Sequence, residues 1–123
     1  MVWYPWLLRI GDYCAIGPDV LIYNLGRVTL GDAVTISYRA HLCAGSHDLL
    51  DPRLPLTRPP IEIGAGTWIG TEAFIGPGVI VAEAAVIGAR AVVVRNVQAG
   101  HFIAGNPGRT VRVRDEYRDG PHA

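Results

Sequence analysis

The chain has 123 residues with 11 basic and 11 acidic side chains, and half of its residues are hydrophobic. This length fits a single domain, no apolar run reaches the roughly 18 residues of a membrane span, and the zero net charge argues against nucleic acid as a partner. Cys14 and Cys43 lack the spacing of a zinc site and fit a reducing compartment. We therefore expect a cytoplasmic protein.

Residues 1–9 are expected to form a lead-in to the domain. They contain neither the basic leader nor the long apolar stretch of a secretion signal. Their aromatic residues, Trp3, Tyr4 and Trp6, are predicted to cap the open end of the structure that follows.

From residue 10 to residue 104 the sequence repeats every six residues. Ile63-Gly64, Ile69-Gly70 and Ile75-Gly76 begin three successive units, and each unit has a small or β-branched residue in fifth place. A period of six fits neither a helix nor a lone strand. Short repeats of this kind are typical of a parallel β-helix, and we predict an all-β domain of about four triangular coils. A sandwich with glycine-rich turns would instead show irregular turn spacing of about 8–12 residues.

The aliphatic residues that start the units are predicted to point inward and form the core. They are Ile10, Ile16, Ile22, Val28, Leu30, Ile36, Leu42, Ile63, Ile69, Ile75, Val81, Ile87 and Val93. Glycine follows many of them, and we expect it to supply corner dihedrals that a side chain would resist. The register slips by two residues at Val28 and Thr29.

One excursion, at residues 48–60, interrupts the repeat. It contains four prolines, which cannot continue a ladder of hydrogen bonds, so we predict a stiff loop that protrudes from one corner. After the β-helix, residues 105–123 are expected to be a C-terminal extension. It should begin with a strand-like segment at 109–114 and end in a charged, frayed tail at 115–123.

Four histidines are candidates for chemistry. His101 lies in a degraded repeat and His122 in the tail, and both are expected to be solvated. His41 and His47 each end a unit, and His47 is the last residue before the excursion. An imidazole beside a protruding loop can act as a general base. The alternative is a surface histidine at a corner.

Five stretches of the sequence carry a resemblance to a known family. They are Tyr4-Pro5-Trp6, Ile22-Tyr23-Asn24-Leu25-Gly26, Leu42-Cys43-Ala44-Gly45-Ser46-His47-Asp48, Trp68-Ile69-Gly70 and Ala104-Gly105-Asn106-Pro107. With the repeat, they resemble the hexapeptide-repeat acyltransferases with a left-handed parallel β-helix, and more narrowly the colanic acid biosynthesis O-acetyltransferases and related sugar acetyltransferases. The resemblance implies a homotrimer that transfers an acetyl group from acetyl-coenzyme A to a hydroxyl of a sugar or polysaccharide precursor, without a metal.

The resemblance also implies roles for particular residues. His47 matches the catalytic base, and Asn24 with its neighbour Tyr23 matches the acceptor-binding position. The positions that match contacts with the cofactor's thiol end, pantetheine arm and phosphates are Trp68, Thr71, Ala89, Arg95, Arg109 and Arg112. Relatives usually carry an additional N-terminal segment that covers the acceptor, so acceptor choice stays open.

Three other functions are compatible with the sequence. Some β-helix trimers are zinc carbonic anhydrases, but zinc needs three protein ligands with an open fourth position, and His41 and His47 supply two. A non-catalytic β-helix is the second alternative. The third is an acetyltransferase that acts on an antibiotic or an amine, since nothing in the sequence separates hydroxyl from amine acceptors.

Overall fold

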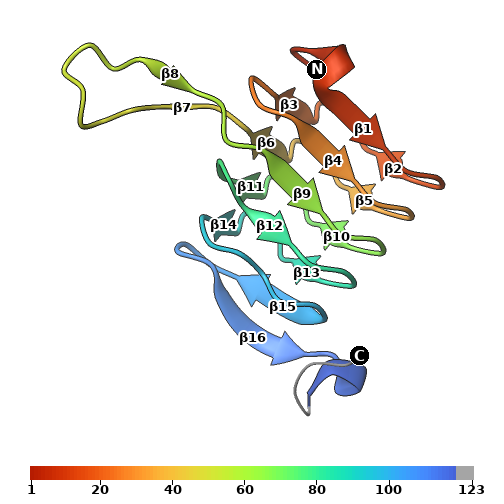
Figure 1. Cartoon of the computed structure of the whole chain (residues 1–123). Helices are drawn as coiled ribbons and strands as arrows, with labels where there is room; N and C mark the ends of the chain where they lie inside the picture. Colours follow the sequence, from red (N-terminus) through yellow and green to blue (C-terminus); the bar gives the residue numbers. More distant parts are fainter. Residues whose placement is uncertain (119–123) are drawn as a thin grey trace.

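The computed structural model describes residues 1–118, and the predicted coil runs through most of them (Figure 1). The coil has three faces, each built from strands of successive turns. The first face consists of β1 (Leu8–Ile10), β4 (Val28–Leu30), β9 (Ile61–Ile63) and β12 (Ile80–Val81). The second face consists of β2 (Ala15–Ile16), β5 (Thr35–Ile36), β10 (Trp68–Ile69), β13 (Val86–Ile87), β15 (His101–Ala104) and β16 (Arg109–Val113). The third face consists of β3 (Leu21–Tyr23), β6 (His41–Cys43), β11 (Phe74–Ile75) and β14 (Val92–Val93).

All pairs within the faces are parallel and in register, except that β16 runs antiparallel to β15. The first face also explains the register slip. Its three longer strands place two inward side chains on each strand, so Val28 lies opposite Ile61 and Leu30 opposite Ile63. The two additional residues therefore lengthen a strand and leave the stacking unchanged. The predicted parallel β-helix of about four coils is confirmed.

The inward side chains form one continuous aliphatic core. From Ile22 to Val93 every predicted unit starter is buried, and small residues such as Ala40, Ala73 and Ala85 fill the corners. Burying one aliphatic side chain of this size contributes about 1.5–3 kcal/mol, so the repeat stabilises each coil through the coils above and below it.

The glycines beside the starters have a different role from the predicted one. Positive φ angles occur instead at other corner residues, among them Asp19, Arg39, Glu72 and Arg90, with φ between 57° and 60°. Gly70 is required for close stacking, because a Cβ there would lie 2.7 Å from the backbone nitrogen of Ala89 in the next coil. The prediction that these glycines supply the corner dihedrals is therefore wrong.

The aromatic lead-in covers only part of the open end. After η1 (Pro5–Leu7) the chain enters β1, while Val2 pairs with Ile22 and so extends the third face. The other two faces stay uncovered, and Ile10 and Ile16 are 47% and 42% exposed. The predicted cap is thus wrong for the first and second faces.

The C-terminal residues return along the last coil. β16 confirms the predicted strand, and η2 (Asp115–Tyr117) follows it. The Tyr117 ring lies so close to Gly100 that a side chain there would collide with it, so the prediction of a frayed tail is wrong for residues 115–118. The rest of that tail, with His122, lies outside the described residues. Within residues 1–118 no helix is long and apolar enough to cross a membrane.

Candidate active site

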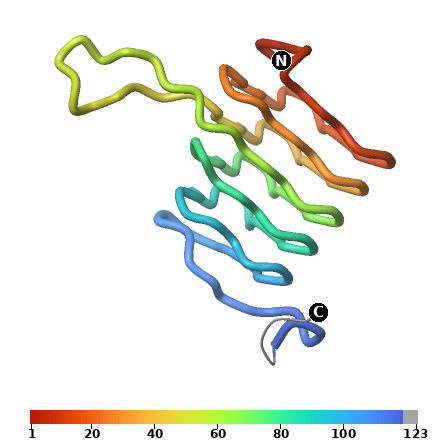
Figure 2. The backbone as a smooth tube through the Cα atoms, in the orientation of Figure 1, coloured from red at the N-terminus to blue at the C-terminus, as the bar shows by residue number. Residues whose placement is uncertain are grey.

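The excursion leaves the β-helix as a two-stranded hairpin. β7 (Ser46–His47) pairs antiparallel with β8 (Leu56–Thr57), and the hairpin stands out from the corner between the third and first faces, named here the hairpin corner (Figure 2). The segment that returns from the hairpin to the β-helix passes so close to Gly26 that a Cβ at Gly26 would lie 2.5 Å from the carbonyl oxygen of Arg58. The predicted protrusion is present, but paired strands form its base where we expected a loop.

His47 is the residue at which the chain enters the hairpin turn. Its side chain is exposed, and Nδ1 lies 2.6 Å from the carbonyl oxygen of Leu54. A carbonyl oxygen only accepts hydrogen bonds, so this contact assigns the proton of the neutral imidazole to Nδ1. The lone pair is then on Nε2, which is the arrangement that a general base needs.

Tyr23 lies next to the segment that leads to His47. Its ring is close enough to Gly45 that a Cβ there would lie 3.0 Å from Tyr23 Cε2, and it makes an edge contact with Trp3. The side chains of Tyr23 and Leu25 take the space beside Gly45. Tyr23 is half-buried and remains a candidate for contact with the acceptor.

Asn24 is fully buried. Its Nδ2 donates to the carbonyl oxygen of Tyr4 at 2.7 Å, and its Oδ1 accepts from the Tyr4 backbone N–H at 2.9 Å. The side chain therefore attaches the lead-in to the first coil. The predicted contact of Asn24 with the acceptor stays a prediction, and it requires access to a carboxamide that Tyr4 already engages.

Several predicted cofactor residues gather on the outside of the second face. The strand register places Trp68, Val86, Phe102 and Arg112 in one row. Trp68 is 53% exposed, and its Nε1 donates to Ser37 Oγ at 2.9 Å. The guanidinium of Arg112 lies over the Phe102 ring, 5.9 Å from its centre. This row presents an aromatic surface that ends in a cation.

Thr71 and Ala89 lie at the corner between the second and third faces, named here the Thr71 corner. The Thr71 carbonyl accepts a hydrogen bond from the Arg90 N–H at 2.8 Å, so consecutive coils place the two residues one above the other. Glu72 contacts Arg90 at 3.3 Å and Arg39 at 3.9 Å. These exposed pairs order the tips of the corner, with little effect on stability.

Arg95 and Arg109 lie at the far end of the coil. Both line a cavity of about 340 Å³, together with Val93, Val97 and Ile103. Arg109 also pairs with Ala104 at the end of the second face, so it lies near the Thr71 corner, beyond Ala89 along the coil. Arg95 follows β14 and lies on the other side of the third face. The structure thus separates Arg95 from the row that contains Trp68 and Arg112.

Most of the predicted site residues form two groups within one chain. His47 and Tyr23 lie at or beside the hairpin corner, whereas Trp68, Thr71, Ala89, Arg109 and Arg112 follow the second face and the Thr71 corner. The third face separates the groups. Its outward side chains are mostly apolar, with Leu21, His41, Phe74 and Val92 in one row.

His41 lies in that row and differs from His47 in its surroundings. Its ring makes an edge contact with Phe74 at 5.2 Å, and its buried Nε2 has no hydrogen-bond partner in the described part of the chain. Burial lowers the pKa of His41. No three His, Cys, Asp or Glu side chains within residues 1–118 come together as a metal site.

Sequence reasoning missed the partners of the predicted residues. Leu54 contacts His47 through its backbone, which no side-chain motif reveals. Ser37 lies 31 positions from Trp68 and becomes its neighbour only when the coils stack. The signal for Ser37 is the repeat itself, because strand register places Thr35 opposite Trp68.

No protein-family profile matches the chain. It is 40% identical over 113 residues to the Escherichia coli (strain K12) protein WcaF, named for acetyl transfer in colanic acid biosynthesis; the match covers 92% of this chain and 62% of that relative. It is 34% identical over 88 residues to galactoside O-acetyltransferase of the same strain, covering 69% of this chain and 43% of the relative.

A solved structure of an acetyltransferase has the same fold as this chain. The hexapeptide-repeat-containing acetyltransferase VCA0836 of Vibrio cholerae O1 biovar eltor, complexed with acetyl-coenzyme A, superposes with a TM-score of 0.80 at 28% identity. The match covers 87% of this chain and 60% of that one. A coil of the opposite hand would not superpose in this way.

The fold is therefore a left-handed parallel β-helix of hexapeptide repeats. The chain is related to the hexapeptide-repeat acetyltransferases, as its motifs indicated, and it spans less than two thirds of the length of these relatives.

Proposed function

We propose that the protein transfers an acetyl group from acetyl-coenzyme A to a hydroxyl of a sugar or polysaccharide precursor, with His47 as the general base. The observation that carries this proposal is the Nδ1 contact of His47 with the Leu54 carbonyl at 2.6 Å. It leaves Nε2 unprotonated on an exposed ring beside the hairpin. The relatives named for acetyl transfer in colanic acid biosynthesis and for galactoside O-acetylation support the acceptor class.

The chemistry follows from the two protonation states of the imidazole. Nε2 takes the proton of the acceptor hydroxyl while its oxygen attacks the thioester carbonyl, a role that accelerates such reactions by roughly 10²–10⁴-fold. When the C–S bond breaks, the imidazolium returns the proton to the departing thiolate, so coenzyme A leaves as the free thiol. His47 keeps its Nδ1–H bond to Leu54 throughout, which holds the ring in one orientation.

A trimer would join the two groups of candidate residues. If the apolar third face of each copy turns toward a threefold axis, the hairpin corner of one copy lies beside the Thr71 corner of the next. His47 and Tyr23 of one copy would then face Trp68, Thr71 and Ala89 of another. The exposed Leu49 and Leu50 at the hairpin tip would contact the neighbouring copy in the same arrangement.

The second face offers a path for acetyl-coenzyme A. Trp68 would contact the thiol end, Thr71 and Ala89 the pantetheine arm, and Arg109 and Arg112 the phosphates, where planar guanidinium groups match phosphate oxygens. Arg95 would reach the cofactor only from the end of the coil. The two cysteines are free thiols, which fits the cytoplasmic location that we propose.

An acceptor screen tests the function. Purified protein is incubated with acetyl-coenzyme A and panels of sugars, amino sugars, antibiotics and amines, and free thiol release is measured. We expect thiol release with hydroxyl acceptors of the sugar panel. Binding of coenzyme A with turnover only on amines would move the protein to the amine-acetylating alternative, and failure to bind coenzyme A would favour a non-catalytic β-helix.

A further inference from the structure

Leu54 has a backbone conformation that its side chain disfavours. Its φ angle is +49°, and the other non-glycine residues with positive φ in residues 1–118 lie at coil corners, outside the hairpin. A conformation of this kind is unfavourable for a residue with a side chain and persists only where the surroundings impose it. At Leu54 the result is a carbonyl that points back at His47 Nδ1. The turn before Leu54 must therefore supply the restraint.

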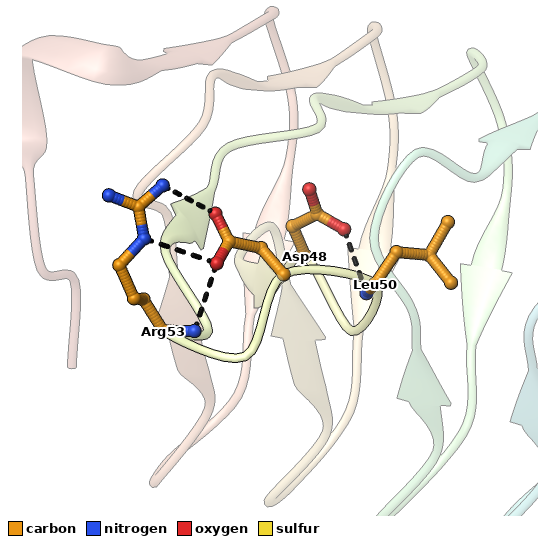
Figure 3. Close-up of polar contacts among 4 residues, drawn as sticks. Asp48, Leu50 and Arg53 are labelled. Atoms are coloured by element: carbon orange, nitrogen blue, oxygen red, sulfur yellow. Dashed lines mark hydrogen bonds and ion pairs between the residues drawn. The ribbon is translucent and has the colours of Figure 1, made fainter.

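The backbone of the turn is closed by hydrogen bonds on both sides of Leu54. The Leu54 N–H donates to the Asp51 carbonyl at 2.9 Å, and the Asp48 N–H donates to the Pro55 carbonyl at 2.9 Å. Asp48 Oδ1 also accepts from the Leu50 N–H at 3.0 Å (Figure 3). These bonds fix Leu54 through its own N–H and the following residue, Pro55, through its carbonyl.

The Asp51 carboxylate holds the turn together. It accepts three hydrogen bonds from Arg53: from the backbone N–H at 2.9 Å, from Nε at 3.2 Å and from Nη2 at 2.9 Å (Figure 3). The Asp51 side chain is only 23% exposed, although that of Arg53 is 88% exposed. These bonds from Arg53 lower the pKa of Asp51. One carboxylate thus sets the geometry of the residue immediately before Leu54.

We propose that Asp51 and Arg53 are positioning residues that act on His47 through the Leu54 carbonyl. They hold the carbonyl where it receives the Nδ1 proton, and so keep the lone pair of the neutral imidazole on Nε2. The catalytic part of this inference rests on the proposed function, in which His47 is the general base. The structural part concerns only the tautomer of His47 and can be measured without turnover.

The tautomer is read from the ¹⁵N chemical shifts of the His47 ring in labelled full-length protein. The His47 signals are assigned by their loss in His47→Gln, and spectra are recorded at about pH 8, where a free imidazole is neutral. We expect the Nδ1–H form to dominate in the wild type. Asp51→Ala should produce a mixture in which both tautomers are readily observed.

Arg53→Ala provides a second, milder variant in case Asp51→Ala does not fold. It keeps the Asp51 bond to the backbone N–H and should give a smaller change of the same kind. The matched control is Asp115→Ala, which removes the exposed Asp115–Arg118 pair, 3.2 Å apart in the wild type. This control should leave the His47 ring signals unchanged.

Turnover supplies the second measurement. Asp51→Ala should lower kcat about 3- to 10-fold, the effect of losing the one hydrogen bond from His47 Nδ1 to the Leu54 carbonyl, with KM for acetyl-coenzyme A unchanged. An unchanged tautomer in both hairpin variants would overturn the inference. A shifted tautomer with wild-type kcat would overturn its catalytic part. If His47 is not the general base, as the proposed function requires, the result would be different: His47→Gln would keep full activity.

Discussion

Asn24 illustrates how a single polar residue fixes a segment that lacks a strand of its own. Both hydrogen bonds of its buried carboxamide go to the backbone of Tyr4. Removing the carboxamide would leave the part-buried Tyr4 N–H without this partner, which costs about 1–3 kcal/mol. It would also remove one of the two hydrogen bonds to the Tyr4 carbonyl, which costs about 0.5–1.5 kcal/mol because the bond from the Leu7 N–H remains.

We expect Asn24→Ala to lower the free energy of unfolding by about 2–4 kcal/mol, measured by urea denaturation. The control is Asn96→Ala, because Asn96 is exposed and accepts a single bond from the Ile80 N–H. The control should lose less than about 1.5 kcal/mol. Equal losses would show that Tyr4 does not depend on Asn24.

His41 makes stability depend on pH. Burial lowers its pKa in the folded chain, so the folded state binds fewer protons than the unfolded state, whose histidine titrates near about 6.5. The stability that neutral His41 contributes is complete above that pH and is lost as the pH falls below it. Urea unfolding of the wild type between about pH 7.5 and 5 should therefore show a larger loss of stability than that of His41→Phe. Parallel curves for the two proteins would contradict this account.

At the scale of the element, the six-residue repeat predicts strand positions and inward side chains well. The period reports which residues stack, and the buried residues from Ile22 to Val93 follow it. It could not predict the glycine roles, since close approach between coils is a property of neighbouring turns. It also could not predict β8, because Leu56–Thr57 pairs antiparallel with β7 outside the repeat.

Gly70 and Gly76 occupy the same position in consecutive units and form a matched pair. A Cβ at Gly70 would lie 2.7 Å from two backbone atoms, Ala89 N and Ile87 O, whereas at Gly76 the nearest atom is 3.4 Å away. Gly70→Ala should destabilise the chain by roughly 1–3 kcal/mol, as overpacking does, and Gly76→Ala should change stability by less than about 1 kcal/mol. Thermal unfolding followed by circular dichroism makes the comparison. Similar midpoints would refute the stacking explanation.

At the scale of the whole molecule, the candidate residues could be named from motifs, but their arrangement could not. His47 and Trp68 are 21 positions apart in sequence, and the fold places them on either side of the third face. Sequence patterns carry no information about which face meets another copy. Phe74 and His41 lie in the apolar outward row of the third face, and this row favours the third face as the one that meets another copy.

Phe74→Arg tests this assembly. We expect it to yield monomers in sedimentation velocity and to lose activity, because a charge buried at an interface without a partner costs several kcal/mol. The control is Ile80→Arg, which places the same charge at an exposed residue on the outside of the first face. The control should remain a trimer. Trimers in both variants would assign the contact to another surface.

The central claim is that His47 takes the acceptor proton. Removing the imidazole of His47 is the most direct test. Turnover of His47→Ala is measured with acetyl-coenzyme A and an acceptor from the screen, beside His41→Phe and the wild type. The account predicts that His47→Ala loses about 10²-fold or more in kcat with unchanged affinity for acetyl-coenzyme A, while His41→Phe stays near the wild type. Wild-type turnover by His47→Ala, or equal losses in both variants, would contradict it.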